Sequence, residues 1–543
     1  MEVYSTFTER KKWAAGAVVI AVVGIIAFWS FSSYNSRRAQ IGILPDSTLY
    51  TTENYTDIFL DSNVVVNFLN SHQISDSAKV QVSEFYARRN YQFAWLNSQD
   101  LNSSVDIFLA QLHNYEFEFD DNSLKNAHFD SLLTIAQQNP KKFLKDKTQA
   151  ERLELWLTST FFVYSQKAFG GTVENTLDLE WFIPRKKKNY QTLLDSLVTN
   201  SKDLAQQEPV NRYYTALKAK LKQYRTIQKA GGLPKVENLS GSLSLGDSLP
   251  GIVSLKKLLY LVNDLRFSDD SPVVNESLLA GIKSYQHRMG LVENGKLDKN
   301  TLAELNKPID ERIRQMMVNL ERLRWVPVEV ESDYLLVNIP EFRLHVFENN
   351  KQVWVTNVVV GKEVHKTTIF KGNISQVVFN PYWGIPNSIV QNEILPKIRR
   401  DPNYLSRNNM EVVNGYYRQK PGRNNALGQI KFLFPNQYSI YLHDTPSKGL
   451  FESNTRAFSH GCIRVKDPKT LAKFVLRNDD SWSEERMDEV LKTNTETQVN
   501  VKPTLPVYIA YFTSWVDNTG QLNFRKDIYG LDAKLESDIF GKK

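Results

Sequence analysis

The only cysteine of the chain lies close to two histidines, in a pattern suited to nucleophilic catalysis. Cys462 is the single cysteine among 543 residues, and His443 and His460 are two of only eight histidines. A thiolate that attacks a carbonyl carbon needs a base that deprotonates it and a third group that orients the base. We therefore predict that Cys462 is the nucleophile of an acyl-transfer reaction. We expect its thiol to be ionised beside an imidazolium, which would lower its pKa from about 8.5 to below neutrality.

The residues around Cys462 predict the remaining roles. His443 ends an apolar strand and can face the sulfur across a loop, so it is predicted to be the base, whereas His460 is given a supporting role. Gly461 lets the backbone approach closely, so the amide of Cys462 can face a developing oxyanion. A backbone carbonyl near His443 or Asp444 is expected to orient the base, without a free carboxylate.

These residues also allow other interpretations. Cys462 could be a buried structural thiol, but its neighbours are Ser, His, Gly and Arg instead of an apolar run. A single cysteine excludes an intramolecular disulfide and a cysteine-based zinc site. No HExxH pair is present, so neither a metal nor another cofactor is expected. The other histidines are scattered along the chain: His72, His113, His128, His287, His345 and His365.

The composition is that of a folded, mildly basic protein. Apolar residues make up 41% and charged residues 23%, which argues against wholesale disorder. The net charge is +7 and the pI is about 9.0. The densest basic run, Arg185 to Lys188, is interpreted as a solvated loop, and no nucleic-acid partner is expected because no such motif is present.

The amino-terminal segment predicts a membrane anchor. Residues 14–31 contain no charged residue and a single serine. As a helix, this segment is long enough to span about one hydrocarbon core of a bilayer. Arg10, Lys11 and Lys12 precede this segment, and positive charge prefers the cytoplasmic side, so the rest of the chain should be exported. A cleaved signal peptide is the alternative; its apolar core would usually be shorter, and no clear cleavage site follows.

The elements that must position the cysteine and its base lie in the last third of the chain. Alternating apolar residues predict strands at 334–339, 343–347, 353–360, 376–379, 439–442 and 507–512. A helix is expected at 311–325. Between them, residues 387–425 are interpreted as a helical and then polar insertion over the sheet, a candidate lid.

The rest of the chain is predicted to be helical. We expect a cytoplasmic tail and transmembrane helix at 1–39 and a linker with an α-helical domain at 40–239. Residues 240–310 should form a compact three-helix unit, in which Asp298 caps the third helix. The catalytic domain is assigned to 311–543. The fold class is therefore multidomain α+β.

Several motifs resemble those of a known family, the L,D-transpeptidases with a YkuD-type catalytic domain. His443-Asp-Thr445 and Ser459-His-Gly-Cys-Ile-Arg464 match its signature. The flanking segments 338–341, 359–361, 379–383, 424–428 and 432–435 look like the long, multidomain branch of this family. Residues 85–95 resemble the scaffold domain of that branch, and the unit at 240–310 resembles a peptidoglycan-binding three-helix domain.

The resemblance implies a reaction and further site residues. In this family a thiolate attacks the third residue of a peptidoglycan stem and expels terminal D-Ala, and an amine of a second stem then forms a 3→3 cross-link. The resemblance also implies acylation of Cys462 by carbapenems and an inner-membrane protein whose catalytic part is periplasmic. It implies these roles: Tyr441, His460, Gly461 and Arg464 for the oxyanion site or for positioning, and Trp383, Asp444, Thr445 and Ser459 for substrate binding.

The sequence leaves two alternatives open. Water could replace the acceptor amine, which would make the protein an L,D-carboxypeptidase or amide hydrolase on the same stems. The chain could also be a non-catalytic wall-anchoring protein. The expected partners are stem peptides, glycan and the inner membrane, and protein partners are not identified by the sequence.

Overall fold

The computed structural model describes residues 56, 58–173, 175–185, 188–200, 208–328 and 330–541. The predicted membrane segment at 14–31 lies outside these residues. Among the residues described, no helix is both long enough and apolar enough to cross a membrane. The chain divides into two compact units, and the helical region at 40–239 contributes to both.

The first unit is helical, as the sequence predicts. It comprises residues 1–111, 123–165 and 189–206. Its core surrounds the fully buried Glu154, whose carboxylate accepts hydrogen bonds from the Tyr86 hydroxyl and from the Ala94 and Trp95 amides. Its helices are α2 (Ser62–Ser71), α3 (Asp76–Arg88), the start of α4 (Ser104–Phe119), α5 (Ala127–Gln138), α6 (Pro140–Phe143), α7 (Lys147–Ser165) and α8 (Tyr190–Asn200).

The second unit contains the predicted three-helix region and the catalytic sheet. The three helices are α10 (Gly251–Leu261), α11 (Glu276–Arg288) and α12 (Lys299–Leu305), beside the paired β1 (Gly241–Ser242) and β2 (Lys296–Leu297). Asp298 caps α12 by accepting from the Thr301 amide, as predicted. Two longer helices, α9 (Arg212–Lys229) and α13 (Ile309–Trp325), pack against each other. Asn211 at the start of α9 donates to the carbonyl of Leu323 at 2.8 Å.

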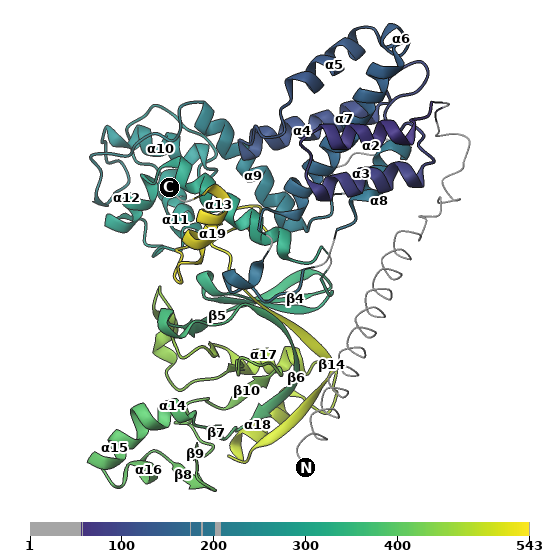
Figure 1. Ribbon diagram of the computed structural model, residues 1–543. Coiled ribbons are helices and arrows are strands. Elements are labelled where there is room, and N and C mark those ends of the chain that lie inside the picture. The colour runs from purple at the N-terminus through teal and green to yellow at the C-terminus, as the bar shows by residue number, and fades with distance from the viewer. Residues whose placement is uncertain are drawn as a thin grey trace, which may run out of the picture. The chain divides into compact units, whose positions relative to one another are not determined.

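A nine-stranded sheet forms the core of the catalytic domain (Figure 1). The order β12-β5-β13-β11-β10-β6-β14-β3-β4 returns on itself, because β4 also pairs with β5. The strands are β3 (Tyr334–Asn338), β4 (Arg343–Glu348), β5 (Lys351–Gly361), β6 (Phe370–Phe379), β10 (Ile430–Leu433), β11 (Leu442–His443), β12 (Ala457–Ser459), β13 (Ile463–Val465) and β14 (Thr497–Ala510). Helices α17 (Pro468–Val475), α18 (Glu484–Lys492) and α19 (Leu531–Phe540) complete the domain.

The strand predicted at 439–442 is shorter and displaced in the structure. β11 contains only Leu442 and His443, because Ser439 has a φ of 55° and belongs to the preceding turn. Asn436 holds this turn: its side-chain amide donates to the carbonyls of Phe434 and Ile440, and its side-chain oxygen accepts from the Ile440 amide. The turn therefore fixes where the strand that carries His443 begins.

The predicted insertion is only partly helical. It contains α14 (Asn387–Ile389), η7 (Val390–Ile394), α15 (Leu395–Arg400) and α16 (Tyr404–Arg407). The segment expected to be polar and irregular instead forms β8 (Met410–Val413) and β9 (Tyr416–Gln419), which extend β7 (Trp383–Gly384) into a three-stranded sheet. Figure 1 shows these elements gathered at one end of the catalytic domain. The sequence missed the two strands because the hairpin turn at Asn414-Gly415 was not recognised.

Candidate active site

Three adjacent strands place the predicted base, His443, beside the segment that carries the predicted nucleophile, Cys462. β11 pairs in parallel with β13, so His443 lies opposite Arg464, and it pairs antiparallel with β10, so Lys431 lies opposite His443. These three side chains therefore share one face of the sheet. Tyr441 and Cys462 lie two residues before His443 and Arg464 and join the same face. The sheet register thus assembles a site that is spread over 34 positions of the sequence, from 431 to 464.

The Cys462 thiol is held by the chain segment that precedes β11. Its Sγ donates to the carbonyl of Ser439 at 3.6 Å. The phenol and the backbone N–H of Tyr441 both donate to the sulfur, which favours the thiolate. Burial nevertheless outweighs these donors and the charges of Lys431 and Arg464, so the pKa of Cys462 is raised. The Tyr441 phenol, whose pKa is also raised by burial, remains a hydrogen-bond donor.

The His443 imidazole is buried and neutral. Its Nδ1 donates to the carbonyl of Asp444 at 2.5 Å, as predicted for the orienting group, so Nε2 is unprotonated and can accept a proton. Burial lowers the pKa of His443 to about 3, helped by the neighbouring charges of Arg464 and Lys431, while the carbonyls of Asp444 and Leu427 act in the opposite direction.

The expected resting ion pair is therefore corrected. A raised thiol pKa and a lowered imidazole pKa favour the neutral thiol with the neutral imidazole near pH 7. The sequence suggested an imidazolium because it shows a histidine near a cysteine but not the burial of both. It also does not show that Lys431 and Arg464 lie near the His443 ring, where their positive charges oppose its protonation.

The turn that presents Cys462 is braced by buried hydroxyls. Ser459 donates to the carbonyl of Cys462 at 2.6 Å and accepts from the Gly461 amide at 3.1 Å. The Thr367 hydroxyl donates to the carbonyl of Gly461 at 2.8 Å, and Gly461 has a φ of 113°. Ser459 is only 2% exposed, so its position favours fixing the turn over the predicted contact with substrate.

Asp444 and Thr445 are likewise used internally. The Asp444 carboxylate accepts from the amides of Gln429 and Thr445 and from Lys448 Nζ. The Thr445 hydroxyl accepts from the Ser447 amide. Asp444 and Thr445 are both buried. Their arrangement favours holding the Asp444 carbonyl against His443 over the predicted role in substrate binding.

The remaining predicted residues connect the site with the insertion. His460 is about half exposed; its Nε2 lies 3.5 Å from the Glu393 carboxylate in η7, and its ring lies 5.2 Å from that of His365. Trp383 is half-buried against the apolar cluster Ile385, Val390 and Ile394 of the insertion. Its contact with substrate stays a prediction.

Sequence reasoning missed Lys431, Asn436 and Thr367. Lys431 Nζ lies 4.0 Å from the centre of the Tyr441 ring, and its charge acts on both Cys462 and His443. No spacing rule indicates it, because it joins the site only through the antiparallel register of β10 and β11. In the described part of the chain, no group of three or more His, Cys, Asp or Glu side chains could hold a metal ion.

Gly428 offers a test of how His443 is positioned. Its φ is 62°, and a Cβ there would come within 2.3 Å of the Asp444 carboxylate. Gly428→Ala should therefore displace Asp444, and with it the carbonyl that holds His443, lowering the free energy of unfolding by about 2–4 kcal/mol. Thermal unfolding and the rate of thiol acylation would measure both effects.

The matched control for this prediction is Gly415→Ala. Gly415 has a φ of 80°, but a Cβ at this position would meet no atom within 4 Å, so the substitution carries the backbone cost alone. Equal losses of stability and of acylation rate in the two variants would contradict the role given to Gly428.

The fold is that of a β-sheet domain, with a half-buried thiol and a buried imidazole on neighbouring segments. Two family models match parts of the chain. The family model of the L,D-transpeptidase catalytic domain, YkuD, matches residues 332–509, and that of the Scaffold domain matches residues 80–221. These matches assign a YkuD-type L,D-transpeptidase catalytic domain and a Scaffold domain to the chain.

A protein of Haemophilus influenzae, named "Putative L,D-transpeptidase", is 31% identical over 242 residues, which are 41% of this chain. The match spans about half of that relative, 49% of its length. Solved structures with some similarity include an L,D-transpeptidase from Stackebrandtia nassauensis (14% identity, 50% of this chain and 97% of that one, TM-score 0.22). Another is an L,D-transpeptidase from Mycobacterium smegmatis (12% identity, 33% of this chain and 58% of that one, TM-score 0.20).

Proposed function

We propose that the protein is a peptidoglycan L,D-transpeptidase that forms 3→3 cross-links through an acyl-enzyme on Cys462. The observation that carries the proposal is the placement of a half-buried thiol and a neutral imidazole on one face of β11 and β13, inside the domain matched by the family model. A neutral imidazole is the form that can accept a proton from an attacking thiol.

The first half-reaction follows from these contacts. As Sγ attacks the carbonyl carbon of the third stem residue, its proton passes to Nε2 of His443. Arg464 and Lys431 stabilise the negative charge on sulfur and oppose a lasting imidazolium, so the proton is readily given to the departing amine of D-Ala. The C–N bond breaks and a thioester forms between Cys462 and the tripeptide stem.

The second half-reaction reverses these roles. An amine of a second stem attacks the thioester, His443 accepts a proton from the amine, and the proton returns to the departing sulfur. If water attacks instead, the product is a free tripeptide. The site residues near Cys462 do not distinguish these acceptors, so the hydrolase is the second candidate.

Incubation of the full chain with disaccharide-tetrapeptide, followed by mass spectrometry, tests the function. We expect a 3→3 dimer together with free D-Ala. Tripeptide without dimer would instead identify a hydrolase. Binding of the disaccharide-tetrapeptide without any release of D-Ala would favour the wall-anchoring protein.

We further propose that residues 14–31 anchor the protein in the inner membrane, with the catalytic part in the periplasm. The proposal is supported by the uncharged apolar run and the basic residues that precede it. Release of the protein from membranes by alkaline carbonate would contradict it.

A further inference from the structure

A cavity lies within the same unit as the nine-stranded sheet, and none of the residues of the candidate active site lines it. Its volume is about 860 Å³, within the range of small-molecule sites. Its floor is the outward face of β3, β4, β5 and β14, and its other walls come from α9, the end of α13 and the hairpin of β15 (Ser514–Val516) and β16 (Leu522–Phe524).

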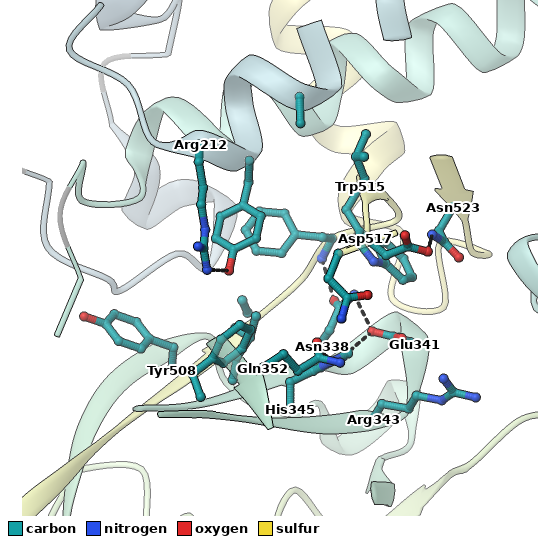
Figure 2. A pocket seen from close by; sticks show the side chains of 18 of the residues that line it. Arg212, Asn338, Glu341, Arg343, His345, Gln352, Tyr508, Trp515, Asp517 and Asn523 are labelled. Atoms are coloured by element: carbon teal, nitrogen blue, oxygen red, sulfur yellow. Dashed lines mark hydrogen bonds and ion pairs between the residues drawn. The ribbon is translucent and has the colours of Figure 1, made fainter. Parts of the chain in front are cut away.

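The floor of this cavity is polar at one end. Along β3 and β4 the inward residues Leu335, Val337, Leu344 and Val346 are fully buried, whereas the alternate residues Asn338, Arg343 and His345 line the cavity. The register places Leu336 opposite His345 and Asn338 opposite Arg343. Figure 2 shows Asn338 of β3, His345 of β4 and Gln352 of β5 close to Glu341, with Trp515 and Asp517 above them.

One buried ion pair organises the floor. The Glu341 carboxylate lies 2.8 Å from His345 Nε2 and also accepts from the side-chain amide of Asn338. The other His345 nitrogen, Nδ1, lies 2.9 Å from Gln352 Oε1. Burial acts to raise the pKa of Glu341, but His345, Arg525 and Arg343 outweigh it and hold this pKa at about 2. Glu341 is therefore charged and already neutralised by His345, whose own pKa its carboxylate raises against the effect of burial.

Arginine and lysine side chains outnumber the carboxylates that line the cavity, four to two. Six lining residues are basic and two are acidic, Glu341 and Asp517. The Asp517 carboxylate is engaged in its own hairpin, where it accepts from the Gln521 amide and from the Asn523 side chain. The basic residues are Arg212, His287, Arg343, His345, Lys351 and Arg525.

The guanidinium groups of Arg343 and Arg525, near Glu341, form no ion pair with a carboxylate in the described part of the chain. Arg525 donates through Nη1 to the carbonyls of Arg288 and Phe524 and lies 5.0 Å from the centre of the Trp515 ring. Its burial, together with the neighbouring charges of Arg343 and Arg456, lowers its pKa to about 10. No hydrogen bond or ion pair joins the Arg343 side chain to another residue in the described part of the chain. Uncompensated charge of this kind is costly in a half-buried cavity and favours an anion.

The other end of the floor is apolar and aromatic. Tyr334 stacks on Phe347 with ring centres 4.4 Å apart, and Tyr508 meets Tyr334 edge to face. Leu336 and Phe512 complete this side. At the far end, Arg212 donates to the Tyr213 hydroxyl at 3.0 Å (Figure 2). A bound molecule would thus meet cations beside Glu341 and a broad apolar surface next to them.

We propose that this cavity is a second ligand site, separate from the cysteine site, for a small carboxylic acid with an apolar or aromatic body. The carboxylate is bound by Arg343 and Arg525, and the body lies against the aromatic wall. The ligand is either a free carboxylic acid or the carboxyl terminus of a short peptide, because both present the same two features.

Calorimetric titration of the full chain tests this site with two probes. 3-Phenylpropionate represents a free acid and the tripeptide Ala-Ala-Phe a peptide carboxyl terminus, and the primary amide of each is its uncharged match. We expect at least one acid to bind and its amide to bind at least about tenfold more weakly, as expected for losing a charge-assisted hydrogen bond. Which acid binds more tightly identifies the source of the ligand.

Two variants locate the binding. Arg343→Gln should weaken acid binding by about tenfold or more, and Ala216→Trp should abolish it by filling the cavity from α9. Arg399→Gln, in the exposed last turn of α15, is the matched control and should not change the dissociation constant. Thermal unfolding verifies that each variant is folded.

The proposal is overturned if neither acid binds at millimolar concentration or if the amides bind as tightly as the acids. It is also overturned if folded Arg343→Gln and Ala216→Trp variants bind like the original chain. These measurements do not depend on turnover, so they remain informative even if the proposed peptidoglycan reaction is wrong.

Discussion

Replacing Cys462 with Ala is expected to abolish acyl-enzyme formation, lowering turnover of tetrapeptide stems on the order of 10⁴-fold or more. The reason is that Cys462 carries the only thiol of the chain, so no second sulfur can take over the attack. The side chain is half-buried and donates one hydrogen bond, to the carbonyl of Ser439. Its removal should therefore change the stability little.

Mass spectrometry after treatment with a carbapenem measures this effect directly. The original chain should gain the mass of one acyl group, located on the peptide that contains Cys462, and the Cys462→Ala variant should gain none. Cys462→Ser supplies a second variant of similar size that retains a hydrogen-bond donor. An adduct of the same yield on the alanine variant would remove Cys462 from the mechanism, whereas unfolding of both variants would be visible in the melting curve.

Replacing His443 with Gln is expected to slow acylation by about 10²- to 10⁴-fold, the range of a lost general base. Glutamine can still donate to the Asp444 carbonyl, which replaces the hydrogen bond made by Nδ1, but it cannot accept a proton. The matched control is His460→Gln. His460 is exposed, and its only charged neighbour at short range among the described residues is the exposed Glu393 carboxylate at 3.5 Å, so we expect less than a tenfold change.

The dependence of the acylation rate on pH tests the same assignment. Because the pKa of His443 is lowered to about 3, the ring stays unprotonated throughout pH 5–8 and its titration should not reduce the rate there. Because burial raises the pKa of Cys462 and His443 takes the thiol proton during the attack, the neutral pair is the reactive form throughout this range, and the rate should be nearly independent of pH. The measurement is the initial rate of carbapenem acylation by stopped flow. A rate that reaches a plateau above an inflection near pH 6.5 would indicate a thiolate–imidazolium pair and contradict the neutral pair.

The structure departs from the pattern of the sequence at the insertion and at β11. The hairpin of β8 and β9 was missed because each strand has only four residues and neither alternates regularly between apolar and polar side chains. β11 was predicted three residues too early because Ile440, Tyr441 and Leu442 continue an apolar pattern through a turn that Asn436 stabilises. The alternation of apolar and polar residues does not reveal a turn that is stabilised by side-chain hydrogen bonds to the backbone.

The sequence by itself predicted the nucleophile, the base and a backbone carbonyl as the group that orients the base, because one cysteine and a nearby histidine leave few other choices. It also predicted the helical first half and the strands β3, β4 and β5, but of β6 and β14 it predicted only the last four residues of each. Only the tertiary structure decided the charge state of the site, since burial and the charges of Lys431 and Arg464 act through space and depend on which strands are neighbours. The same holds for the cavity beside Glu341, whose walls come from segments more than 300 residues apart, such as Arg212 and Arg525.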